Sequence, residues 1–432
     1  MEIHKLYELY QNYPEISTDS RCIKEKSIFF ALKGENFDGN KFAREAIENK
    51  AEYAVIDKSY SKSDDRFILV EDTLNTLQKL ANYHRKKCGM KILAITGSNG
   101  KTTTKELIFE ILNKQYKVYA TKGNLNNHIG VPLTILSMSP DIEIGIVEMG
   151  ANHPGEIKQL CEITEPDFGL ITNIGKAHLE GFRSVEGVSE AKAELFRYLK
   201  YNKGTILGNA NDSYIKDIIP KDYNNILLYG NKLSGHWGHY LASDPYLKFV
   251  LFLDNNDKGL EIKTKLFGKY NLENAVAASV FAYFLNIKKE TIKKSLEEYT
   301  PVNNRSQIVK TRNNKIFLDA YNANPTSMKA AIEDFIEVDI KNKYFILGEM
   351  LEVGSTTYNE HKIILKLLKD RKIRNVLCVG KEFQKSANEF DYSFFESIDG
   401  LVEFLKTCEI KNANVFIKGS RANQLEKLVQ YL

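Results

Sequence analysis

The sequence has few cysteines, no long apolar run and no excess of one charge. Its five cysteines are scattered and none lies in a Cys-x-x-Cys pattern, so we expect buried thiols in a reducing compartment, and neither disulfides nor a zinc site. No run of about 18 apolar residues occurs and the N-terminus lacks the apolar core of a signal peptide, which predicts a cytoplasmic protein without membrane insertion. The 60 basic and 56 acidic side chains leave a net charge of +4, too balanced to favour a nucleic-acid partner.

Residues 92–104 follow the order that a phosphate-binding loop requires. An apolar strand leads into two glycines, Gly97 and Gly100, and a helix-like segment follows. Between the glycines and that segment, Lys101 supplies a positive charge and Thr102 a hydroxyl for Mg²⁺. The glycines stand closer together than in the common pattern, but a plain turn would leave the Lys-Thr-Thr sequence unexplained. The loop therefore predicts that the chain binds a nucleoside triphosphate.

Strand and helix signals alternate along most of the 432 residues, which are enough for about three domains. Alternation of this kind predicts parallel sheets covered by helices. We expect an α/β protein with a small N-terminal α/β domain (1–88), a central P-loop ATPase domain built on a parallel sheet (89–302) and a C-terminal Rossmann-like, doubly wound domain (303–432). Residues 225–267 predict an antiparallel addition to the central domain, and residues 421–431 predict a final helix.

Three side chains outside the loop are candidates for chemistry. Glu148 ends an apolar strand, where a carboxylate beside a phosphate loop is placed to bind Mg²⁺; the alternative is a capping or surface carboxylate. His178 follows another strand and is either a metal ligand or a hydrogen-bonding loop residue. Arg305 follows the linker before the last domain and either reaches the γ-phosphate or is an ordinary surface arginine.

Lys192 lies on the apolar stripe of a helix predicted at 189–200. A lysine there is costly unless its charge reaches solvent, pairs with an acid or is removed by chemistry. Extension of the side chain to solvent is the common solution. The alternative is that CO₂ has converted the amine into a carbamate, an anion that can bind a metal ion.

The order of these motifs along nearly the whole chain resembles that of the Mur ligases. The C-terminal motifs, such as Asn-Ala-Asn-Pro at 322–325 and Lys-Gly-Ser-Arg at 418–421, resemble those of the family member that adds D-alanyl-D-alanine. The segments that carry the resemblance are 19–21, 29–39, 96–104, 123–132, 148–150, 173–178, 191–196, 321–328, 347–354 with His361, and 418–421.

The resemblance implies roles for individual residues. Thr102 and Glu148 would bind one Mg²⁺, and His178 with carbamylated Lys192 a second. The catalytic residues would be Lys101, His178, Lys192 and Arg305. The nucleotide would be held by Gly97, Ser98, Asn99, Gly100, Lys101, Thr102 and Thr103 at its phosphates, by Arg305 at the γ-phosphate, by Asn271 and Asn274 near the adenine, and by Asp319 at the ribose. The other substrates would contact Ser20, Arg21, Lys33, Gly34, Asn126, Asn127, His128, Asn322 and Asn324.

Two positions depart from the family pattern. Tyr270 stands where relatives often have a histidine before Asn271, and this leaves the role of Tyr270 open. Ala320 follows Asp319 where relatives often have a second acidic residue, although the ribose contact of Asp319 remains available.

The implied reaction is an ATP-dependent amide ligation through an acyl phosphate. D-Ala-D-Ala would be joined to UDP-N-acetylmuramoyl-tripeptide, whose third residue is either meso-diaminopimelate or lysine, by a monomer that uses ATP and two Mg²⁺ ions. One alternative is a Mur-type or folylpolyglutamate-type ligase that adds a single amino acid. Another is a nucleotide-controlled switch, which explains the phosphate loop but not His178, Lys192 and Arg305 together.

Overall fold

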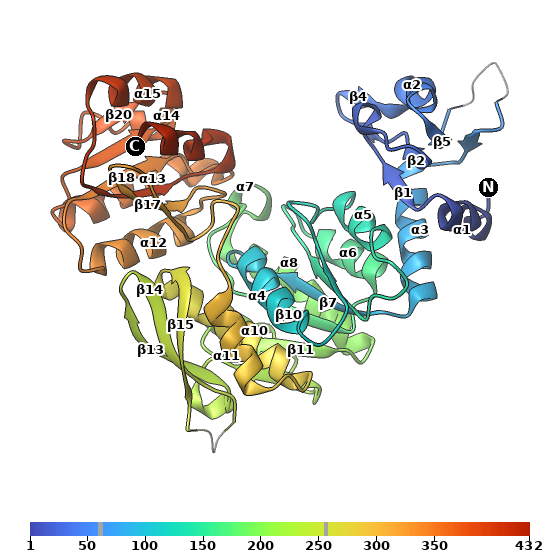
Figure 1. Cartoon of the computed structure of the whole chain (residues 1–432), viewed down its shortest axis with the longest axis horizontal. Coiled ribbons are helices and arrows are strands. Elements are labelled where there is room, and N and C mark those ends of the chain that lie inside the picture. The colour runs from blue at the N-terminus through green and yellow to red at the C-terminus, as the bar shows by residue number, and fades with distance from the viewer. Residues whose placement is uncertain (59–63, 255–257) are drawn as a thin grey trace.

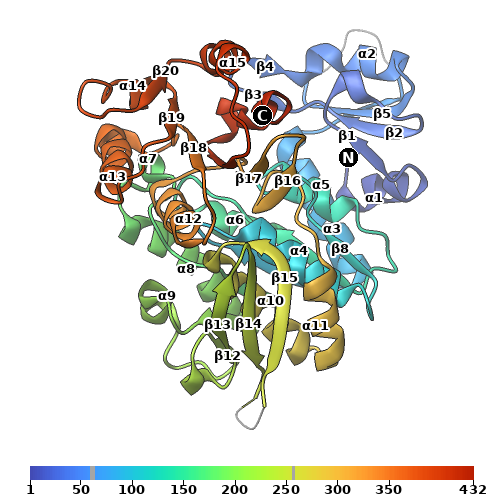
Figure 2. The same ribbon diagram turned by 60° about the vertical axis from the view of Figure 1, so that its left-hand side comes forward.

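A computed structural model of the chain describes residues 1–58, 64–254 and 258–432. It contains three α/β units, and Figure 1 shows the N-terminal unit in blue and the C-terminal unit in orange to red on opposite sides of the central one. In the turned view of Figure 2, both outer units lie at the top, with most of the central unit below them. The predicted α/β class with three units is confirmed.

The N-terminal unit has a four-stranded parallel sheet in the order β1-β2-β5-β6 and a two-stranded antiparallel ribbon, β3-β4. Its last helix, α3, packs on helices α5 and α6 of the central unit and therefore joins the two units. The strands are β1 (Glu15–Ser17), β2 (Ser27–Phe30), β3 (Lys33–Gly34), β4 (Phe37–Asp38), β5 (Ala51–Ile56) and β6 (Phe67–Leu69), and the helices are α1 (Ile3–Asn12), α2 (Ala43–Glu48) and α3 (Thr73–Cys88).

The central unit is a six-stranded, wholly parallel sheet in the order β12-β11-β10-β7-β9-β8. Its strands are β7 (Lys91–Thr96), β8 (Val118–Ala120), β9 (Ile144–Glu148), β10 (Phe168–Ile171), β11 (Thr205–Asn209) and β12 (Ile226–Tyr229). Its helices are α4 (Lys101–Leu112), α5 (Gly130–Leu136), α6 (Glu156–Thr164), α7 (Leu179–Phe182), α8 (Val185–Tyr201), α9 (Ser213–Ile218), α10 (Leu272–Phe284) and α11 (Lys289–Glu298).

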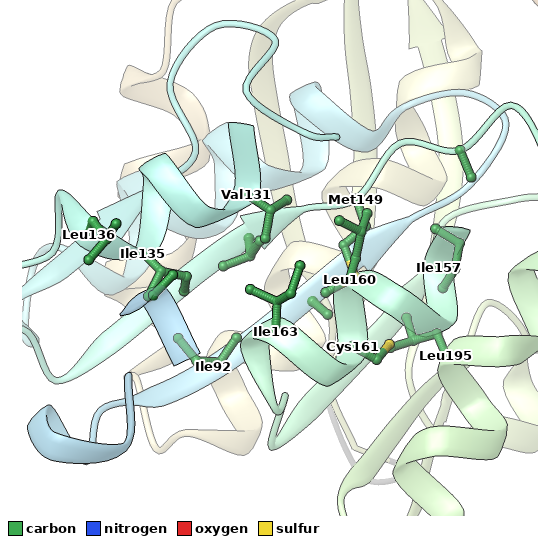
Figure 3. Close-up of a cluster of buried hydrophobic side chains, with 14 of the residues drawn as sticks. Ile92, Val131, Ile135, Leu136, Met149, Ile157, Leu160, Cys161, Ile163 and Leu195 are labelled. Carbon is green, nitrogen blue, oxygen red and sulfur yellow. The ribbon is translucent and has the colours of Figure 1, made fainter. Parts of the chain in front are cut away.

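Apolar side chains cover both faces of this sheet. On one face, Ile92 of β7 belongs to a buried cluster with Val131 of α5, Leu160 of α6 and Leu195 of α8 (Figure 3). On the other face, side chains of α4, α10 and α11 form a second buried cluster with side chains of the sheet. A parallel sheet needs this cover because both of its faces are apolar, and the cover leaves the strand ends free to form a site.

The antiparallel addition predicted within 225–267 is a three-stranded sheet, β13 (Trp237–Ser243), β14 (Tyr246–Phe252) and β15 (Leu260–Phe267). Strand β13 had no clear signal in the sequence, because most of its side chains are half-buried and do not alternate between core and solvent. Gly238 lets β13 approach α10, since a Cβ atom at this position would lie 2.7 Å from Val276 Cγ2.

The C-terminal unit is a six-stranded sheet in the order β16-β17-β21-β18-β19-β20, in which only β16 runs antiparallel to its neighbour. Its strands are β16 (Gln307–Lys310), β17 (Lys315–Asp319), β18 (Lys343–Gly348), β19 (Val376–Val379), β20 (Ser393–Phe395) and β21 (Asn414–Lys418). Its α-helices are α12 (Pro325–Glu337), α13 (Thr357–Asp370), α14 (Lys381–Gln384) and α15 (Ile398–Thr407).

The prediction of a single helix at 421–431 is wrong. This segment forms two 3₁₀ helices, Arg421–Asn423 and Leu425–Tyr431. Leu425 and Leu428, three residues apart, are both fully buried. A 3₁₀ helix places residues i and i+3 directly above one another, so it suits this spacing better than an α-helix.

The central and C-terminal units share an aromatic core. Phe267, at the end of β15, is 1% exposed and packs against the rings of Phe317 and Phe335, at centroid distances of 5.0 and 6.2 Å. The rings of Phe345 and Phe416 complete this cluster. Phe267 is thus a residue of the central unit buried in the core of the next one.

Within the three described segments, no helix is long and apolar enough to cross a lipid bilayer.

A buried histidine fixes α1 and α3 to the central unit. His84 Nε2 lies 2.8 Å from the carbonyl oxygen of Met138, and Nδ1 lies 3.2 Å from the hydroxyl of Tyr7. The network assigns the proton to Nε2, which donates to the carbonyl, while Nδ1 accepts from the hydroxyl. Burial lowers the pKa of His84, which holds the ring in its neutral form.

We therefore expect the free energy of unfolding to decrease as the pH falls, because His84 is buried in its neutral form. Below the ordinary pKa of 6.5 the unfolded chain takes up a proton that the folded chain excludes, so the free energy of unfolding decreases by up to about 1.4 kcal/mol per pH unit. His84→Asn should reduce this slope in denaturation curves between pH 7 and pH 5. The exposed His239 provides the control, since His239→Asn should keep the wild-type slope; equal slopes in all three proteins would contradict the assignment.

Candidate functional site

A cavity of about 670 Å³ lies between the central and C-terminal units, where the carboxyl ends of strands from both sheets face each other. The phosphate loop after β7, Glu148 at the end of β9 and Asn173 after β10 line one side. Asp319 at the end of β17 and Lys418 at the end of β21 line the other. The carboxyl edge of a parallel sheet is the usual place for a ligand.

The glycines of the phosphate loop cannot be replaced without a clash. Gly97 has φ 145° and a Cβ atom there would lie 1.9 Å from Thr172 Oγ1. Gly100 has φ 79°, and its Cβ atom would lie 2.3 Å from Asn274 Oδ1. Helix α4 begins at Lys101, so its free N–H groups face the loop. The two glycines therefore allow a loop conformation that residues with a Cβ atom could not adopt, and binding of phosphate by this loop stays a prediction.

Lys101 folds back onto this loop. Its Nζ donates to the carbonyl oxygen of Gly97 at 2.7 Å. Burial lowers the pKa of Lys101, and the nearby charge of Glu148 opposes that shift while Arg305 adds to it. The ammonium thus lies in a site where an anion would stabilise its charge.

Glu148 is buried and fully engaged. Its carboxylate accepts from Thr102 Oγ1 at 2.8 Å and from Asn126 Nδ2 at 3.0 Å, and Lys105 Nζ lies 3.7 Å away. Burial raises the pKa of Glu148, but the surrounding cations, of which Lys105 acts most strongly, bring it below its ordinary value. Thr102 and Glu148 together offer the oxygen ligands that Mg²⁺ prefers.

His178 lies in the cavity wall and Lys192 does not. His178 precedes α7 and its Nδ1 lies 2.5 Å from Glu352 Oε2 of the C-terminal unit. Lys192 on α8 is 2% exposed, and within the described residues no hydrogen bond or ion pair reaches its side-chain amine. Burial lowers the pKa of Lys192 well below its ordinary value, and the charge of Lys101 adds to this effect. No group of three or more His, Cys, Asp or Glu side chains is placed to hold a metal ion within the segments that the structure describes.

A polar network joins the start of α10 to the linker. Asn274 Nδ2 donates to Asn271 Oδ1 at 3.0 Å, and Asn271 Nδ2 donates to Ser306 Oγ at 2.9 Å. The Tyr270 hydroxyl lies 2.8 Å from the same Ser306 Oγ. Asn271, Asn274 and Tyr270 all line the cavity, and the network therefore sets the shape of this end of it.

On the C-terminal side, two cations in the cavity wall are held by residues of the same unit. The guanidinium carbon of Arg305 lies 3.7 Å from the centroid of the Tyr321 ring, a cation–π contact. Lys418 Nζ donates to Asp319 Oδ2 at 2.5 Å and to the carbonyl of Asn322 at 3.3 Å. The Asp319 carboxylate is thereby fixed at the cavity wall.

Direct contacts connect the two sides of the cavity. Asn324, which caps α12, donates from Nδ2 to Asn99 Oδ1 of the phosphate loop at 2.8 Å. The Lys176 N–H donates to Thr326 Oγ1 at 3.0 Å, and its Nζ lies 2.5 Å from Glu360 Oε1. The C-terminal unit is therefore closed onto the phosphate loop.

The predicted residues of the N-terminal unit lie outside this cavity. Ser20 is buried, Arg21 makes two hydrogen bonds to Asp19 at 2.9 and 2.7 Å, and Lys33 Nζ lies 2.8 Å from Asp57 Oδ2. Gly34 lies in β3. In contrast, the cavity wall does include the predicted residues Asn126, Asn127, His128 and Asn322. The carbonyl of His128 accepts from Gln78 Nε2 of α3 at 2.9 Å, so the wall is attached to the helix that joins the units.

Three family descriptions match this chain in succession. "Mur ligase family, catalytic domain" covers residues 12–85, "Mur ligase middle domain" covers 95–282, and "Mur ligase, glutamate ligase domain" covers 304–421. A curated relative, the UDP-N-acetylmuramoyl-tripeptide–D-alanyl-D-alanine ligase of Rickettsia prowazekii, is 33% identical over 97% of this chain and 95% of its own length. The chain belongs to the Mur ligase family.

Solved structures of Mur ligases support this assignment. The crystal structure of MurF from Acinetobacter baumannii superposes with a TM-score of 0.88 at 28% identity, covering 98% of this chain and 97% of that one. MurF ligase from Thermotoga maritima, crystallised in complex with ADP, has a TM-score of 0.86 at 27% identity and covers 96% of each chain. The similarity extends through all three units of the Mur ligase.

Sequence reasoning missed some polar residues of this Mur ligase site. Lys105, one turn into α4, is 4% exposed and is not among the predicted site residues. Ser306 had no signal, because its role depends on contacts with Tyr270 and Asn271, about 35 residues earlier. Lys418 belongs to a segment that carries the family resemblance, but no local pattern identifies Asp319 as its partner.

We expect Gly100→Ala to impair nucleotide binding. Its new Cβ would meet Asn274, whose side chain is buried and already hydrogen-bonded to Thr104 and Asn271, so it cannot move aside. The dissociation constant for ADP, measured by titration calorimetry, should rise at least about tenfold, since a loop displaced by a few tenths of an ångström loses several hydrogen bonds.

Gly89→Ala is the matched control. Gly89 also has a positive φ, 66°, but nothing lies within 4 Å of its Cβ position. It should lower the melting temperature slightly, through backbone strain of about 1 kcal/mol, and leave ADP binding unchanged. Equal affinity of Gly100→Ala and wild type would exclude the loop as the phosphate site.

Proposed function

We propose that this Mur ligase joins D-Ala-D-Ala to UDP-N-acetylmuramoyl-tripeptide and that amide formation is coupled to the conversion of ATP to ADP and phosphate. The observation that carries the proposal is the whole-length match to ligases of that name, together with a cavity that holds the phosphate loop, Glu148 and Arg305. The protein is proposed to act in the cytoplasm, which ATP dependence and five free cysteines support, and to act as a monomer. Its domains are proposed to span residues 1–88, 89–302 and 303–432.

The nucleotide is assigned to the cavity residues in the order of its parts. The triphosphate is proposed to bind residues 97–103, the adenine to lie near Asn271 and Asn274, and the ribose to contact Asp319. The N-terminus of α4 lies at this loop and would provide partial positive charge for the phosphates, to which Lys101 would add a full charge. The Asp319 carboxylate, fixed by Lys418, is an acceptor for ribose hydroxyls.

Two Mg²⁺ ions are proposed to accompany ATP. Thr102 and Glu148 would hold one through oxygen, and His178 with carbamylated Lys192 would hold the other. When bound, Mg²⁺ would neutralise phosphate charge that repels an attacking anion. Lys101 and Arg305 contribute to the same end, since both are cations in the cavity wall.

The bond changes follow from the chemistry of a carboxylate. A carboxylate oxygen of the tripeptide attacks the γ-phosphorus, ADP leaves, and an acyl phosphate remains. The amine of D-Ala-D-Ala attacks the acyl carbon, loses a proton, and displaces phosphate as the amide forms. Arg305 is proposed to remain bound to the phosphoryl group while it is transferred, because the planar guanidinium can donate two hydrogen bonds to phosphate oxygens. The contacts of Asn324 and Lys176 across the cavity favour exclusion of water, which would otherwise hydrolyse the acyl phosphate.

The substrate contacts are proposed at two separate places. Ser20, Arg21, Lys33 and Gly34 would bind the UDP-sugar on the N-terminal unit. Asn126, Asn127 and His128 would face the peptide, and Asn322 and Asn324 the D-Ala-D-Ala. An extended substrate fits this separation, since its nucleotide end and its reactive carboxylate are far apart.

The direct test is ADP release with each component left out in turn. With UDP-N-acetylmuramoyl-tripeptide, D-Ala-D-Ala and ATP together, release should exceed every incomplete mixture by at least about a hundredfold, because phosphoryl transfer requires all partners in place. Single amino acids, including D-alanine and L-glutamate, should not replace the dipeptide. ADP release without any acceptor would favour a nucleotide switch, and release with one amino acid would favour the single-residue ligases.

Lys192 is expected to depend on CO₂. Its lowered pKa provides the neutral amine that reacts with CO₂. Removal of dissolved CO₂ should lower turnover by about tenfold or more, as loss of a metal ligand does, and bicarbonate should restore it. With ¹³C-bicarbonate, carbon NMR should show one carbamate signal that is absent in Lys192→Gln. Turnover indifferent to CO₂ together with no such signal would refute the carbamate.

A further inference from the structure

The linker that carries Arg305 has an unusual backbone. Asn303, Asn304 and Ser306 have φ values of 62°, 57° and 47°, so three residues around Arg305 are in the left-handed region. Asparagine tolerates this conformation, whereas serine rarely adopts it. The direction in which Arg305 leaves the backbone therefore depends on whatever holds Ser306 in place.

Ser306 is held by two side chains of the central unit. It is 4% exposed, and its Oγ accepts from Asn271 Nδ2 at 2.9 Å and shares a hydrogen bond with the Tyr270 hydroxyl at 2.8 Å. Asn271 also donates to the carbonyl of Phe267 at 2.7 Å, so its amide cannot turn away. These contacts fix the residue immediately after Arg305.

Tyr270 is itself held by contacts with both the central and the C-terminal unit. Its backbone N–H donates to Asp334 Oδ2 of α12 at 3.1 Å, and its ring packs edge-on against Phe267 with centroids 6.5 Å apart. Because α12 belongs to the C-terminal unit and Phe267 to the central one, Tyr270 has a defined position relative to both. Its hydroxyl is thus a rigid partner for Ser306.

Arg305 is only partly held by its own contacts. Its guanidinium stacks on Tyr321 at 3.7 Å, but its Nε is buried and, within the described residues, has no hydrogen-bond partner. The side chain lines the same cavity as Lys101. Stacking leaves the guanidinium free to slide in the plane of the ring, so the backbone at 305–306 must set where it points.

We propose that Tyr270 is a positioning residue: its hydroxyl holds Ser306 in the left-handed conformation and thereby aims Arg305 at the γ-phosphate. The inference rests on the proposed function, in which Arg305 meets that phosphate. It gives a role to Tyr270, which the sequence leaves open. The alternative role for Tyr270, direct contact with the nucleotide, makes a different prediction for ADP, which lacks the γ-phosphate.

Tyr270→Phe in the full chain separates the two roles. Because one buried hydrogen bond is lost, the kcat for ligation should be about tenfold lower than in wild type. The dissociation constant of ADP should stay within about twofold of wild type, because no hydrogen bond to the nucleotide is lost. Tyr116→Phe is the matched control, because it also removes a partly buried hydroxyl, bonded to Leu285 O at 2.9 Å and remote from the cavity. It should retain wild-type kcat.

A double-mutant cycle tests the connection with Arg305. Arg305→Ala alone should lower kcat by about a hundredfold or more, as removal of a charged donor to a transition state does. Adding Tyr270→Phe to Arg305→Ala should then cause no further loss. Additive losses, or weakened ADP binding in Tyr270→Phe, would overturn the positioning role.

Two further results would separate a failure of the proposed function from a failure of the positioning role. If Arg305→Ala ligates at the wild-type rate, the γ-phosphate role of Arg305 fails and the proposed positioning of it fails as well. If Tyr270→Phe does not fold, judged by its melting temperature, Ser306→Ala must show the same tenfold loss of kcat and the same unchanged ADP affinity. A Ser306→Ala enzyme with full activity would refute the inference.

Discussion

The site depends on the burial of Phe267 in the core of a neighbouring unit. This ring ends β15, and it is surrounded by phenylalanines from β17 and α12. Burial of an aromatic side chain contributes about 1.5–3 kcal/mol, so the C-terminal sheet cannot swing away without exposing this surface. The carboxyl ends of both sheets are therefore held opposite each other, and the cavity between them receives Glu148 from one side and Asp319 from the other.

Charge balance decides which states of the cavity are stable. The Glu148 carboxylate would be costly in a buried place on its own, but Lys105 and the more distant Lys101 and Arg305 compensate for it. Polyphosphate brings more negative charge, and the same cations are then available to it. The cations that stabilise the buried Glu148 carboxylate thus also provide positive charge for an anionic ligand.

Much of the fold could be predicted from local sequence patterns, whereas many contacts within the site could not. The phosphate loop, Glu148 and the parallel sheets were predictable, because glycine spacing and apolar strands are properties of neighbouring residues. The contact of Lys418 with Asp319 joins residues 99 positions apart, and no local pattern reveals such a pair. Strand β13 was missed because it lacks alternation, and the 3₁₀ segments at the C-terminus were mistaken for an α-helix because i, i+3 spacing suits both. The roles assigned to individual site residues stay predictions.

Helix α3 belongs to two units at once. Its apolar side chains lie in the same buried cluster as Ile92 and Leu160, while its first residue, Thr73, donates to the carbonyl of Ala31 in the N-terminal unit. Gln78 in its middle holds the carbonyl of His128. A rotation of the N-terminal unit about α3 must therefore either break the contact with His128 or displace the cavity wall. Movement of the N-terminal unit is thus coupled to the shape of a cavity that none of its described residues lines.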